Sequence, residues 1–274
     1  MRQPTEIISG VIRLGDNQVH CLRMGHGQKL LLAFHGFSNE AADFSIFLPY
    51  LKEEYTIVAI DLPGHGSTLW QDTYMEQKDL MALVQGIKND FNTEKFSIMG
   101  YSLGGRIALN IIEKQPNWVD KVVLLAADGM KKNFWYNLAT KNVFGKVIFK
   151  KIVENPKGWI KHLETLKKLH IIDESRYKFA STKLLNPQVN KQVAYVWPTL
   201  KKLIPLIPVV RYHIKKRKIP VYIFMGEHDR VIKIKNAKHL TQGLKTVHLT
   251  TLNCGHHVVT AETLPLITKV LLED

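Results

Sequence analysis

A serine between two glycines stands where an apolar run gives way to a helix-like run. The motif Gly100-Tyr101-Ser102-Leu103-Gly104 follows the strand-like residues 96–99 and precedes the helix-like residues 106–112. A tight turn there would hold the Ser102 hydroxyl out at the end of a sheet, with a helix N-terminus behind it. Glycines allow the strand and the helix to approach closely because they have no Cβ atom. The spacing therefore predicts a nucleophilic serine.

The sequence also supplies a histidine that can activate this hydroxyl. A serine is a weak nucleophile until a neighbouring base accepts its proton. Among the 12 histidines, His256 follows the strand-like run 247–252, in a loop near the end of the chain. The adjacent His257 is the alternative, but its side chain would point in another direction. We therefore predict His256 as the base.

An aspartate after another apolar run would orient the imidazole. Asp229 follows the strand-like residues 221–225 and so lies at the sheet edge where ligands bind. A carboxylate there fixes the histidine tautomer and stabilises the imidazolium that forms during the reaction. Asp128, after residues 122–125, is the rival, although Asp128-Gly129 is also typical of an ordinary turn. A solvated turn aspartate is the remaining alternative for Asp229.

Two backbone N–H groups are expected to bind the negative oxygen that forms when serine attacks a carbonyl. One is that of Leu103, directly after the serine. The other is that of Phe37, because His35-Gly36-Phe37 follows the early strand-like run 30–34. Gly36 lets the backbone come close to a substrate, and His35 is expected to brace the loop rather than to react.

Taken together, these motifs resemble those of the α/β-hydrolase fold superfamily. The matching pieces occur in the order and at the spacing of that family: His35-Gly36-Phe37, Asp61-Leu62-Pro63-Gly64-His65-Gly66-Ser67, Gly100-Tyr101-Ser102-Leu103-Gly104-Gly105, Gly226-Glu227-His228-Asp229 and Gly255-His256. The resemblance implies a serine hydrolase with a Ser-Asp-His triad and gives residues 61–67 a structural role. It says much less about the substrate, because one fold serves many reactions.

The elements that must position these residues alternate between strands and helices. Strand-like runs lie at 7–14, 19–24, 30–34, 56–60, 96–99, 122–125, 221–225 and 247–252, and helix-like runs at 41–52, 75–91, 103–114, 233–242 and 258–272. This alternation predicts an α/β fold with an eight-stranded, mostly parallel sheet covered by helices on both faces. The first two runs have no helix between them and predict an antiparallel edge.

Residues 130–218 interrupt this alternation. They contain helix-like stretches at 159–170 and 174–184 and several prolines. The interruption resembles the helical cap that α/β-hydrolases insert over the active site, so we expect residues 1–129 and 219–274 to form the hydrolase core. A cap shapes the pocket and excludes water.

Positive charge is concentrated in this insertion. Residues 131–218 carry 21 Lys and Arg against 4 Asp and Glu, a net charge of +17, whereas the whole chain is +14. Such asymmetry attracts anionic partners. Three readings stay open: a surface that rests on an anionic membrane, a pocket for an anionic substrate, and a solubilising lysine-rich surface. No nucleic-acid partner is expected, because no recognition module is present.

Compartment and cofactors are constrained by what the sequence lacks. Its two cysteines, Cys21 and Cys254, are far apart and predict free thiols in a reducing cytoplasm. The N-terminal residues do not have the pattern of a signal peptide, and no apolar run is long enough to span a membrane. We therefore expect a cytoplasmic protein. If the basic insertion rests on an anionic membrane, the protein would also be in peripheral contact with that membrane. No cofactor and no metal site are expected, since no ligand spacing stands out.

Ester hydrolysis is the leading reading of the reaction. A small-molecule carboxylic ester, lipid-like in one version, would be attacked by Ser102. The candidate pocket residues are His35, Gly36, Tyr101 and Arg106, with Phe37 beside them. A second reading rests on Arg106, because Gly100-Tyr101-Ser102-Leu103-Gly104-Gly105-Arg106 is similar to the menaquinone-pathway synthase family, which binds carboxylates with arginines. A non-catalytic ligand-binding protein of the same fold is the third.

Overall fold

The computed structural model describes residues 7–131, 136, 140, 143–172, 174, 177, 178, 181 and 185–273. The chain divides into two compact units. The core unit contains residues 1–131 and 203–274, and the inserted unit contains residues 132–202. Each unit is described by itself below.

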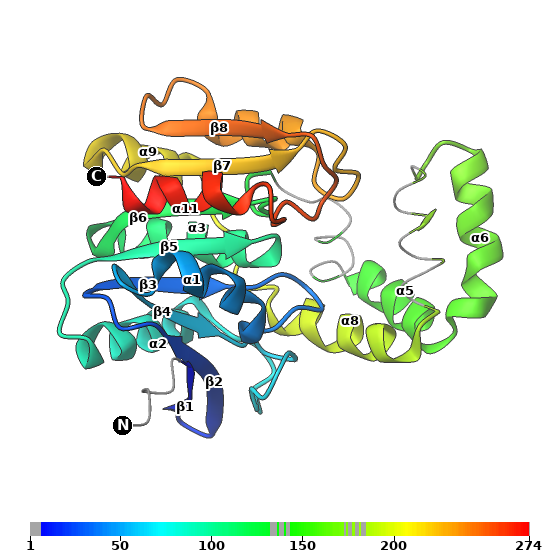
Figure 1. The fold of residues 1–274 in the computed structure, drawn as a ribbon. Coiled ribbons are helices and arrows are strands. Elements are labelled where there is room, and N and C mark those ends of the chain that lie inside the picture. The colour runs from blue at the N-terminus through cyan, green and yellow to red at the C-terminus, as the bar shows by residue number, and fades with distance from the viewer. Residues whose placement is uncertain are drawn as a thin grey trace. The chain divides into compact units, whose positions relative to one another are not determined.

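The core unit is built on one eight-stranded sheet (Figure 1). Its strands are β1 (Ile7–Leu14), β2 (Asn17–Met24), β3 (Lys29–Phe34), β4 (Tyr55–Ile60), β5 (Phe96–Tyr101), β6 (Val119–Leu125), β7 (Val221–Gly226) and β8 (Val247–Leu252). Their order in the sheet is β1-β2-β4-β3-β5-β6-β7-β8. β2 pairs antiparallel with β1 and with β4, and every pairing from β4 to β8 is parallel. The predicted mostly parallel sheet with an antiparallel edge is confirmed.

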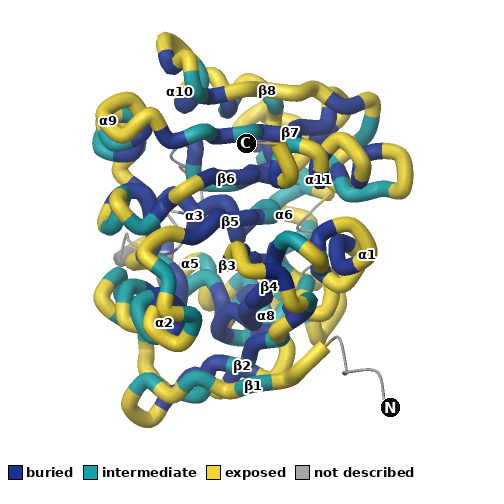
Figure 2. Tube along the Cα trace, turned by 60° about the vertical axis from the view of Figure 1, so that its left-hand side comes forward, coloured by how far each residue is buried: buried dark blue, intermediate teal, exposed yellow. Residues whose placement is uncertain are grey.

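The central strands are almost entirely buried because both faces of the sheet are covered. All six residues of β4 are buried, and β5 and β6 appear mainly in dark blue in Figure 2. Strands buried on both faces lose the alternation of polar and apolar residues that marks a half-exposed strand. The edge strand β1 is mostly exposed, and it does show a mixed pattern.

Helices cover both faces of this sheet. On one face, the 3₁₀-helix η1 (Ala41–Phe47), α1 (Leu48–Leu51) and α11 (Leu264–Leu272) bury Phe47, Leu51 and Ile267 against inward-facing strand residues. On the other face lie α2 (Gln77–Asp90), α3 (Leu103–Lys114) and α9 (Ile207–Arg217), with α3 in contact with β3, β5 and β6. α3 is almost entirely buried, so the helix that starts at the motif serine is fixed at the centre of the molecule's core unit.

Three expected helices are shorter or tighter than the sequence predicted. The run 41–52 is split into η1 and α1, and the run 233–242 forms the 3₁₀-helix η3 (Ile234–Ala237) and the four-residue α10 (Lys238–Thr241). In the run 258–272, a regular helix begins only at Leu264. The residues before it are held by the Thr263 hydroxyl, which donates to the carbonyl oxygen of Val258 at 2.6 Å, and such local side-chain bonds compete with a helix.

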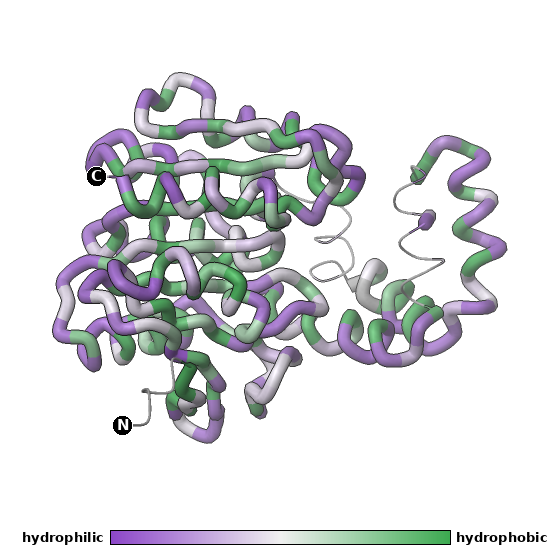
Figure 3. Tube along the Cα trace, in the orientation of Figure 1, coloured by the Kyte–Doolittle hydropathy of each residue, from purple (hydrophilic) through white to green (hydrophobic). Residues whose placement is uncertain are grey.

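The inserted unit is helical in its described part. It contains α5 (Val143–Glu154), α6 (Pro156–Lys168) and α8 (Pro187–Thr199). The rings of Phe149 on α5 and Trp197 on α8 stack 5.4 Å apart, and the Tyr136 hydroxyl donates to the carbonyl oxygen of Trp197. Hydrophilic and hydrophobic residues alternate along α6 (Figure 3). Most of the expected helix 174–184 lies outside the described residues.

The boundary of the insertion differs from the expected 130–218. Residues 203–218 belong to the core unit, because α9 packs against α3 there. The connection into α9 is also tied to the core: the amide of Leu206 donates to Glu113 Oε2 on α3 at 2.7 Å. The lysines and arginines at the end of α9 favoured its assignment to the basic insertion. Its buried residues Val210 and Ile214 place it instead in the core unit.

Candidate active site

Ser102 occupies a sharp turn between β5 and α3. Its backbone has φ 49° and ψ −110°, a left-handed region that a residue with a Cβ atom rarely adopts. The turn is held by the neighbouring strand, since the Ser102 amide donates to the carbonyl oxygen of Leu125 at 2.9 Å and its own carbonyl accepts from Asp128 at 2.8 Å. A Cβ at Gly100 would lie 2.6 Å from the carbonyl oxygen of Gly104, so no larger residue fits there.

Ser102, His256 and Asp229 form a continuous hydrogen-bonded chain. His256 Nε2 lies 3.0 Å from Ser102 Oγ, and His256 Nδ1 lies 2.7 Å from Asp229 Oδ2. The imidazole therefore has one nitrogen toward the hydroxyl and the other toward the carboxylate, which is the arrangement that a general base needs. His257, the alternative base, is exposed and takes no part in this chain.

The carboxylate of Asp229 is fixed on its other side by the backbone. Its Oδ1 accepts hydrogen bonds from the amides of Val231 and Ile232 at 2.7 and 2.9 Å, and its side chain is completely buried. The loop that carries His256 lies directly against the end of β7, because a Cβ at Gly226 would be 1.9 Å from the carbonyl oxygen of Gly255. Gly226 thus permits the close approach that brings the acid and the base together.

The loop after β3 is pressed against the serine turn from the opposite side. A Cβ at Gly104 would lie 1.8 Å from the carbonyl oxygen of Phe34, and a Cβ at Gly36 would lie 2.9 Å from the Tyr101 ring. Within the part of the chain that the structure describes, neither the amide of Phe37 nor that of Leu103 donates to a protein oxygen. Leu103 follows Ser102 directly, and Phe37 follows Gly36 in the loop that packs on Tyr101, so both predicted donors belong to segments next to the serine and are uncommitted.

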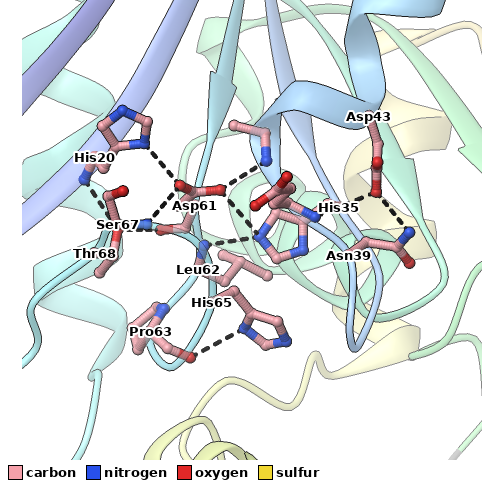
Figure 4. Close-up of polar contacts among 12 residues, drawn as sticks. His20, His35, Asn39, Asp43, Asp61, Leu62, Pro63, His65, Ser67 and Thr68 are labelled. Atoms are coloured by element: carbon pink, nitrogen blue, oxygen red, sulfur yellow. Dashed lines mark hydrogen bonds and ion pairs between the residues drawn. The ribbon is translucent and has the colours of Figure 1, made fainter.

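His35 fixes the orientation of the peptide that carries the Phe37 amide. Its Nδ1 lies 2.7 Å from the carbonyl oxygen of Gly36. Its Nε2 accepts from the amide of Leu62 at 3.0 Å (Figure 4). The same Gly36 oxygen accepts from the amide of Asn39. Since C=O and N–H point in opposite directions across a trans peptide, holding the Gly36 oxygen aims the Phe37 N–H the other way. The expected bracing by His35 thus has a specific geometry. His35 was also predicted as a pocket residue, but it is 1% exposed and lies inside the core unit.

Asp61 anchors the surrounding loops. Its Oδ1 accepts from the amide of Ala41, and its Oδ2 accepts from the amide of Ser67 and lies 2.7 Å from His20 Nδ1 (Figure 4). Burial by itself would raise the pKa of Asp61, but these three hydrogen bonds outweigh it and the pKa is lowered. The carboxylate therefore stays charged and holds the loops after β3 and β4 together.

His65 completes this buried group. Burial, followed by the neighbouring His35, lowers the pKa of His65 to about 4. Burial also lowers the pKa of His35. The edge of the His65 ring meets the rings of His35 and Phe37, with centroids 4.8 and 5.8 Å away. Both imidazoles are therefore neutral at neutral pH and act as polar packing around the Phe37 loop.

Tyr101 lies between the two sides of the site. Its ring contacts Gly36, and its hydroxyl is 3.4 Å from the carbonyl oxygen of His256. Burial, with the negative charge of Asp229 as a further cause, raises the pKa of Tyr101 to about 12. The phenol therefore stays neutral and supports the His256 loop.

Arg106 does not occupy the predicted place in a substrate pocket. Its side chain is 8% exposed and forms an ion pair with Asp128, with Nε 3.0 Å from Oδ2. The Asp128 carboxylate is engaged by this guanidinium, whereas the Asp229 carboxylate faces His256. Arginine and carboxylate commonly form such fixed pairs because the guanidinium is planar and permanently charged.

Some contributors to the site had no signal in the sequence. His20 lies on β2, far along the chain from Asp61, and only the pairing of β2 with β4 brings the two together. Gly226 belongs to the predicted motif Gly226-Glu227-His228-Asp229, but its close approach to the His256 loop was not predicted. No group of three or more His, Cys, Asp or Glu that could hold a metal occurs among the described residues. In that same part of the chain, no helix combines the length and the apolar character needed to cross a bilayer.

The strand order, the serine turn and the position of the acid and histidine after β7 and β8 define an α/β-hydrolase fold. Residues 25–263 match the family described as "Serine aminopeptidase, S33", and the chain belongs to this family of hydrolases.

Named relatives agree with this placement. An uncharacterized hydrolase of Bacillus subtilis, YugF, is 27% identical over 254 residues, which cover 89% of this chain and 88% of the relative. A pimeloyl-[acyl-carrier protein] methyl ester esterase of Legionella pneumophila is 31% identical over 105 residues, 38% of this chain and 40% of that one. The solved structure of a 2-hydroxy-6-oxo-6-phenylhexa-2,4-dienoate hydrolase from Rhodococcus superposes with a TM-score of 0.60 at 24% identity, covering 92% of each chain. This last likeness shows the fold.

Proposed function

We propose that the protein is a serine hydrolase that cleaves carboxylic esters through an acyl-enzyme intermediate. The observation that carries this proposal is the chain of contacts from Ser102 Oγ through His256 to Asp229, at 3.0 and 2.7 Å, on a strained turn at the end of the sheet. A hydroxyl held in this way next to a base and uncommitted backbone amides is suited to acyl transfer.

In the first half of the reaction, Ser102 Oγ attacks the ester carbonyl carbon while its proton passes to His256 Nε2. Asp229 keeps the other imidazole proton on Nδ1 and stabilises the imidazolium. The carbonyl oxygen becomes negative and is bound by the amides of Phe37 and Leu103, aided by the positive N-terminal end of α3. The tetrahedral intermediate then expels the alcohol, which takes the proton from His256, and leaves the acyl group on Ser102.

In the second half, water replaces the alcohol. His256 Nε2 accepts a proton from the water as its oxygen attacks the acyl carbonyl, and the same two amides bind the new negative oxygen. Collapse of this intermediate returns the proton to Ser102 Oγ and releases a carboxylic acid. The backbone donors are fixed before the substrate arrives, so little reorganisation is required during the reaction.

An ester is favoured over the amine-terminal peptide that the family's description names. An aminopeptidase must bind the free ammonium group of its substrate, which calls for an uncommitted carboxylate close to the serine. The backbone amide of Asp128 donates to the Ser102 carbonyl, but the Asp128 carboxylate forms an ion pair with Arg106. The carboxylate of Asp229 is paired with His256. The Legionella relative is named for hydrolysis of a methyl ester, which supports an ester substrate here as well.

The two alternatives from the sequence have less support. The synthase reading required Arg106 to bind a substrate carboxylate, but this guanidinium is buried against Asp128. A purely ligand-binding protein would not need Ser102, His256 and Asp229 to lie within hydrogen-bonding distance of one another. Both alternatives make the same prediction of no ester turnover, so one experiment separates them from the proposal.

The test is hydrolysis of p-nitrophenyl esters of graded acyl length by the purified protein, beside Ser102→Ala. We expect turnover with one preferred chain length and a loss of at least about a thousandfold in the variant. Circular dichroism shows whether the variant remains folded. Turnover that survives in Ser102→Ala, or none with any ester, would contradict the proposal.

A further inference from the structure

Three large apolar side chains are exposed on one face of α5 in the inserted unit. Phe144, Val147 and Ile148 are 81%, 50% and 47% exposed. They are three and four residues apart, so they share one stripe of the helix surface. Lys151 continues the same stripe and is also exposed. Scattered single apolar residues are common on protein surfaces, but a contiguous stripe of this kind marks a binding surface.

This stripe lies on the side of α5 that faces away from α8. Phe149 stacks on Trp197 of α8, and the carbonyl oxygen of Val153 accepts a hydrogen bond from Asn190 of α8 at 2.6 Å. These two residues lie roughly opposite the stripe on a helix of 3.6 residues per turn. These contacts between α5 and α8 are therefore made without Phe144, Val147 and Ile148.

The inserted unit that carries the stripe is rich in positive charge. Residues 132–202 contain 15 Lys and Arg against 4 Asp and Glu. Lys150 and Lys151 on α5 are exposed, as are Lys157 and Lys161 on the neighbouring α6. Lysine side chains beside an apolar stripe can lie along it and hold their ammonium groups outward, where they meet anionic groups.

From these features we propose that the α5 stripe docks on an anionic lipid surface, with the large residues entering the boundary between headgroups and acyl chains and the lysines contacting lipid phosphates. Helices that lie in a membrane interface combine an aromatic and aliphatic face with flanking lysines, as α5 does. Anionic headgroups attract such segments, and salt weakens the attraction. An acidic protein would satisfy the lysines, but it offers less to three adjacent aliphatic and aromatic side chains. This surface is independent of the proposed hydrolysis, because no residue of the serine site belongs to it.

The experiment is sedimentation of the full-length protein with vesicles of phosphatidylglycerol and phosphatidylcholine, and with vesicles of phosphatidylcholine alone. We expect the wild-type protein to bind the mixed vesicles, to bind phosphatidylcholine weakly, and to be released by high salt. The triple variant Phe144→Ser/Val147→Ser/Ile148→Ser should lower the partition coefficient at least about tenfold.

A matched control uses apolar residues of similar exposure elsewhere. Ile8 and Val11 on the edge strand β1 are 57% and 54% exposed, and Ile8→Ser/Val11→Ser should bind the mixed vesicles as the wild-type protein does. The triple variant should retain its circular dichroism spectrum and the wild-type rate on a short-chain soluble ester. The proposal is overturned if the wild-type protein ignores anionic vesicles, which would leave an acidic protein as the occupant. It is also overturned if the triple variant binds as tightly as the wild-type protein, or if the control loses binding equally.

Discussion

Ser102 combines a reactive position with an unfavourable backbone conformation. With φ 49° and ψ −110°, its Cβ is crowded by the adjacent peptide groups. Hydrogen bonds from the Ser102 amide to Leu125 and from Asp128 to the Ser102 carbonyl keep the turn in place. The conformation projects the hydroxyl toward His256. The unfavourable backbone energy of Ser102 therefore accompanies the orientation of its side chain.

The cost of this conformation can be measured by comparing two variants that both lack the hydroxyl. Ser102→Gly should be more stable than Ser102→Ala by about 1 kcal/mol, because glycine tolerates a positive φ and alanine keeps the crowded Cβ. Urea unfolding of the two proteins at neutral pH gives the difference. Equal stabilities, or a more stable alanine variant, would mean that the turn is not strained.

A variant of His35 tests whether this side chain holds the Phe37 amide in its orientation. His35→Phe removes the ring nitrogens that contact the Gly36 oxygen and the Leu62 amide. The Gly36 oxygen then keeps the Asn39 amide but loses the imidazole, so the Gly36–Phe37 peptide should be less firmly oriented. We expect kcat to fall about tenfold to a hundredfold with little change in KM, because the oxyanion forms only in the transition state. Steady-state kinetics on a p-nitrophenyl ester measure both constants. A rise in KM with an unchanged kcat would instead assign His35 to substrate binding.

At the residue scale, the sequence was most informative where chemistry and spacing coincide. Ser102, Asp229 and His256 each follow a strand and stand in one order along the chain, and the structure brings all three together. The prediction for Arg106 was wrong. Its spacing of four residues from the serine indicates which face of the helix it lies on, but it does not reveal the ion pair with Asp128. His20 was missed, since its contact with Asp61 depends on which strands become neighbours in the sheet.

At the scale of elements, close approaches between loops and strand ends assemble the site. The end of β7 meets the loop after β8 at Gly226, and the start of α3 meets the end of β3 at Gly104. In both places a backbone oxygen stands where a Cβ would be, within 1.9 Å at Gly226 and 1.8 Å at Gly104. These glycines set the distance between elements that carry different parts of the site.

Gly226→Ala should disturb the base without touching it. The added methyl group would push the carbonyl oxygens of Gly255 and Cys254, and the loop that carries His256 would have to move. A displacement of about 1 Å in such a site lowers the rate about a hundredfold, so we expect a loss of that size in kcat/KM together with a lower melting temperature.

The control is another glycine-to-alanine change far from any close contact. Gly86 lies inside α2, and a Cβ there would meet nothing within 4 Å. Gly86→Ala should leave kcat/KM unchanged and raise stability by about 0.5–1 kcal/mol, because alanine favours a helix. If Gly226→Ala were as active as Gly86→Ala, the approach of the β7 end to the His256 loop would not control the site.

All eight strands and the longest helices of the core unit could be predicted, because buried apolar runs and helical periodicity are local signals. α3 has the predicted bounds, Leu103–Lys114. The short connections were less predictable, since runs such as 41–52 satisfy a helical pattern while local packing produces a 3₁₀-helix. The extent of the insertion also escaped prediction, because only the packing of α9 on α3 shows that residues 203–218 belong to the core unit.

At the scale of the whole molecule, the two units differ in their packing and in their charge. The core unit is held by a sheet covered on both faces and contains the buried polar group around Asp61, His35 and His65. The inserted unit carries a large excess of lysine and arginine over acidic residues. Buried neutral histidines make the global stability of the molecule sensitive to acid.

Stability should decrease as the pH falls from about 6.5 toward 4. Above this range His65 is neutral in both states; within it the unfolded chain takes up a proton while the folded protein does not, since burial lowers the pKa of His65 from 6.5 to about 4. The loss is about 1.4 kcal/mol for each pH unit, or about 3 kcal/mol in total, and His35 acts in the same direction. Urea unfolding at several pH values measures it.

The matched variants are His65→Gln and His26→Gln. Glutamine cannot take up the proton, so His65→Gln should reduce the dependence of unfolding free energy on pH. His26 has a side chain that is 60% exposed, and its replacement should leave the dependence as it is in the wild-type protein. The same slope in all three proteins would show that burial of His65 does not contribute.

The most direct test of the proposed function is to find the acyl group on the enzyme. The wild-type protein is mixed with a p-nitrophenyl ester, quenched in acid within the first turnovers, digested and analysed by mass spectrometry. We predict an added acyl mass on the peptide that contains Ser102, a burst of p-nitrophenol equal to the enzyme concentration when deacylation is the slower step, and neither signal in Ser102→Ala. Turnover with no acyl group at Ser102, or with the acyl group on another residue such as Cys254, would contradict the account.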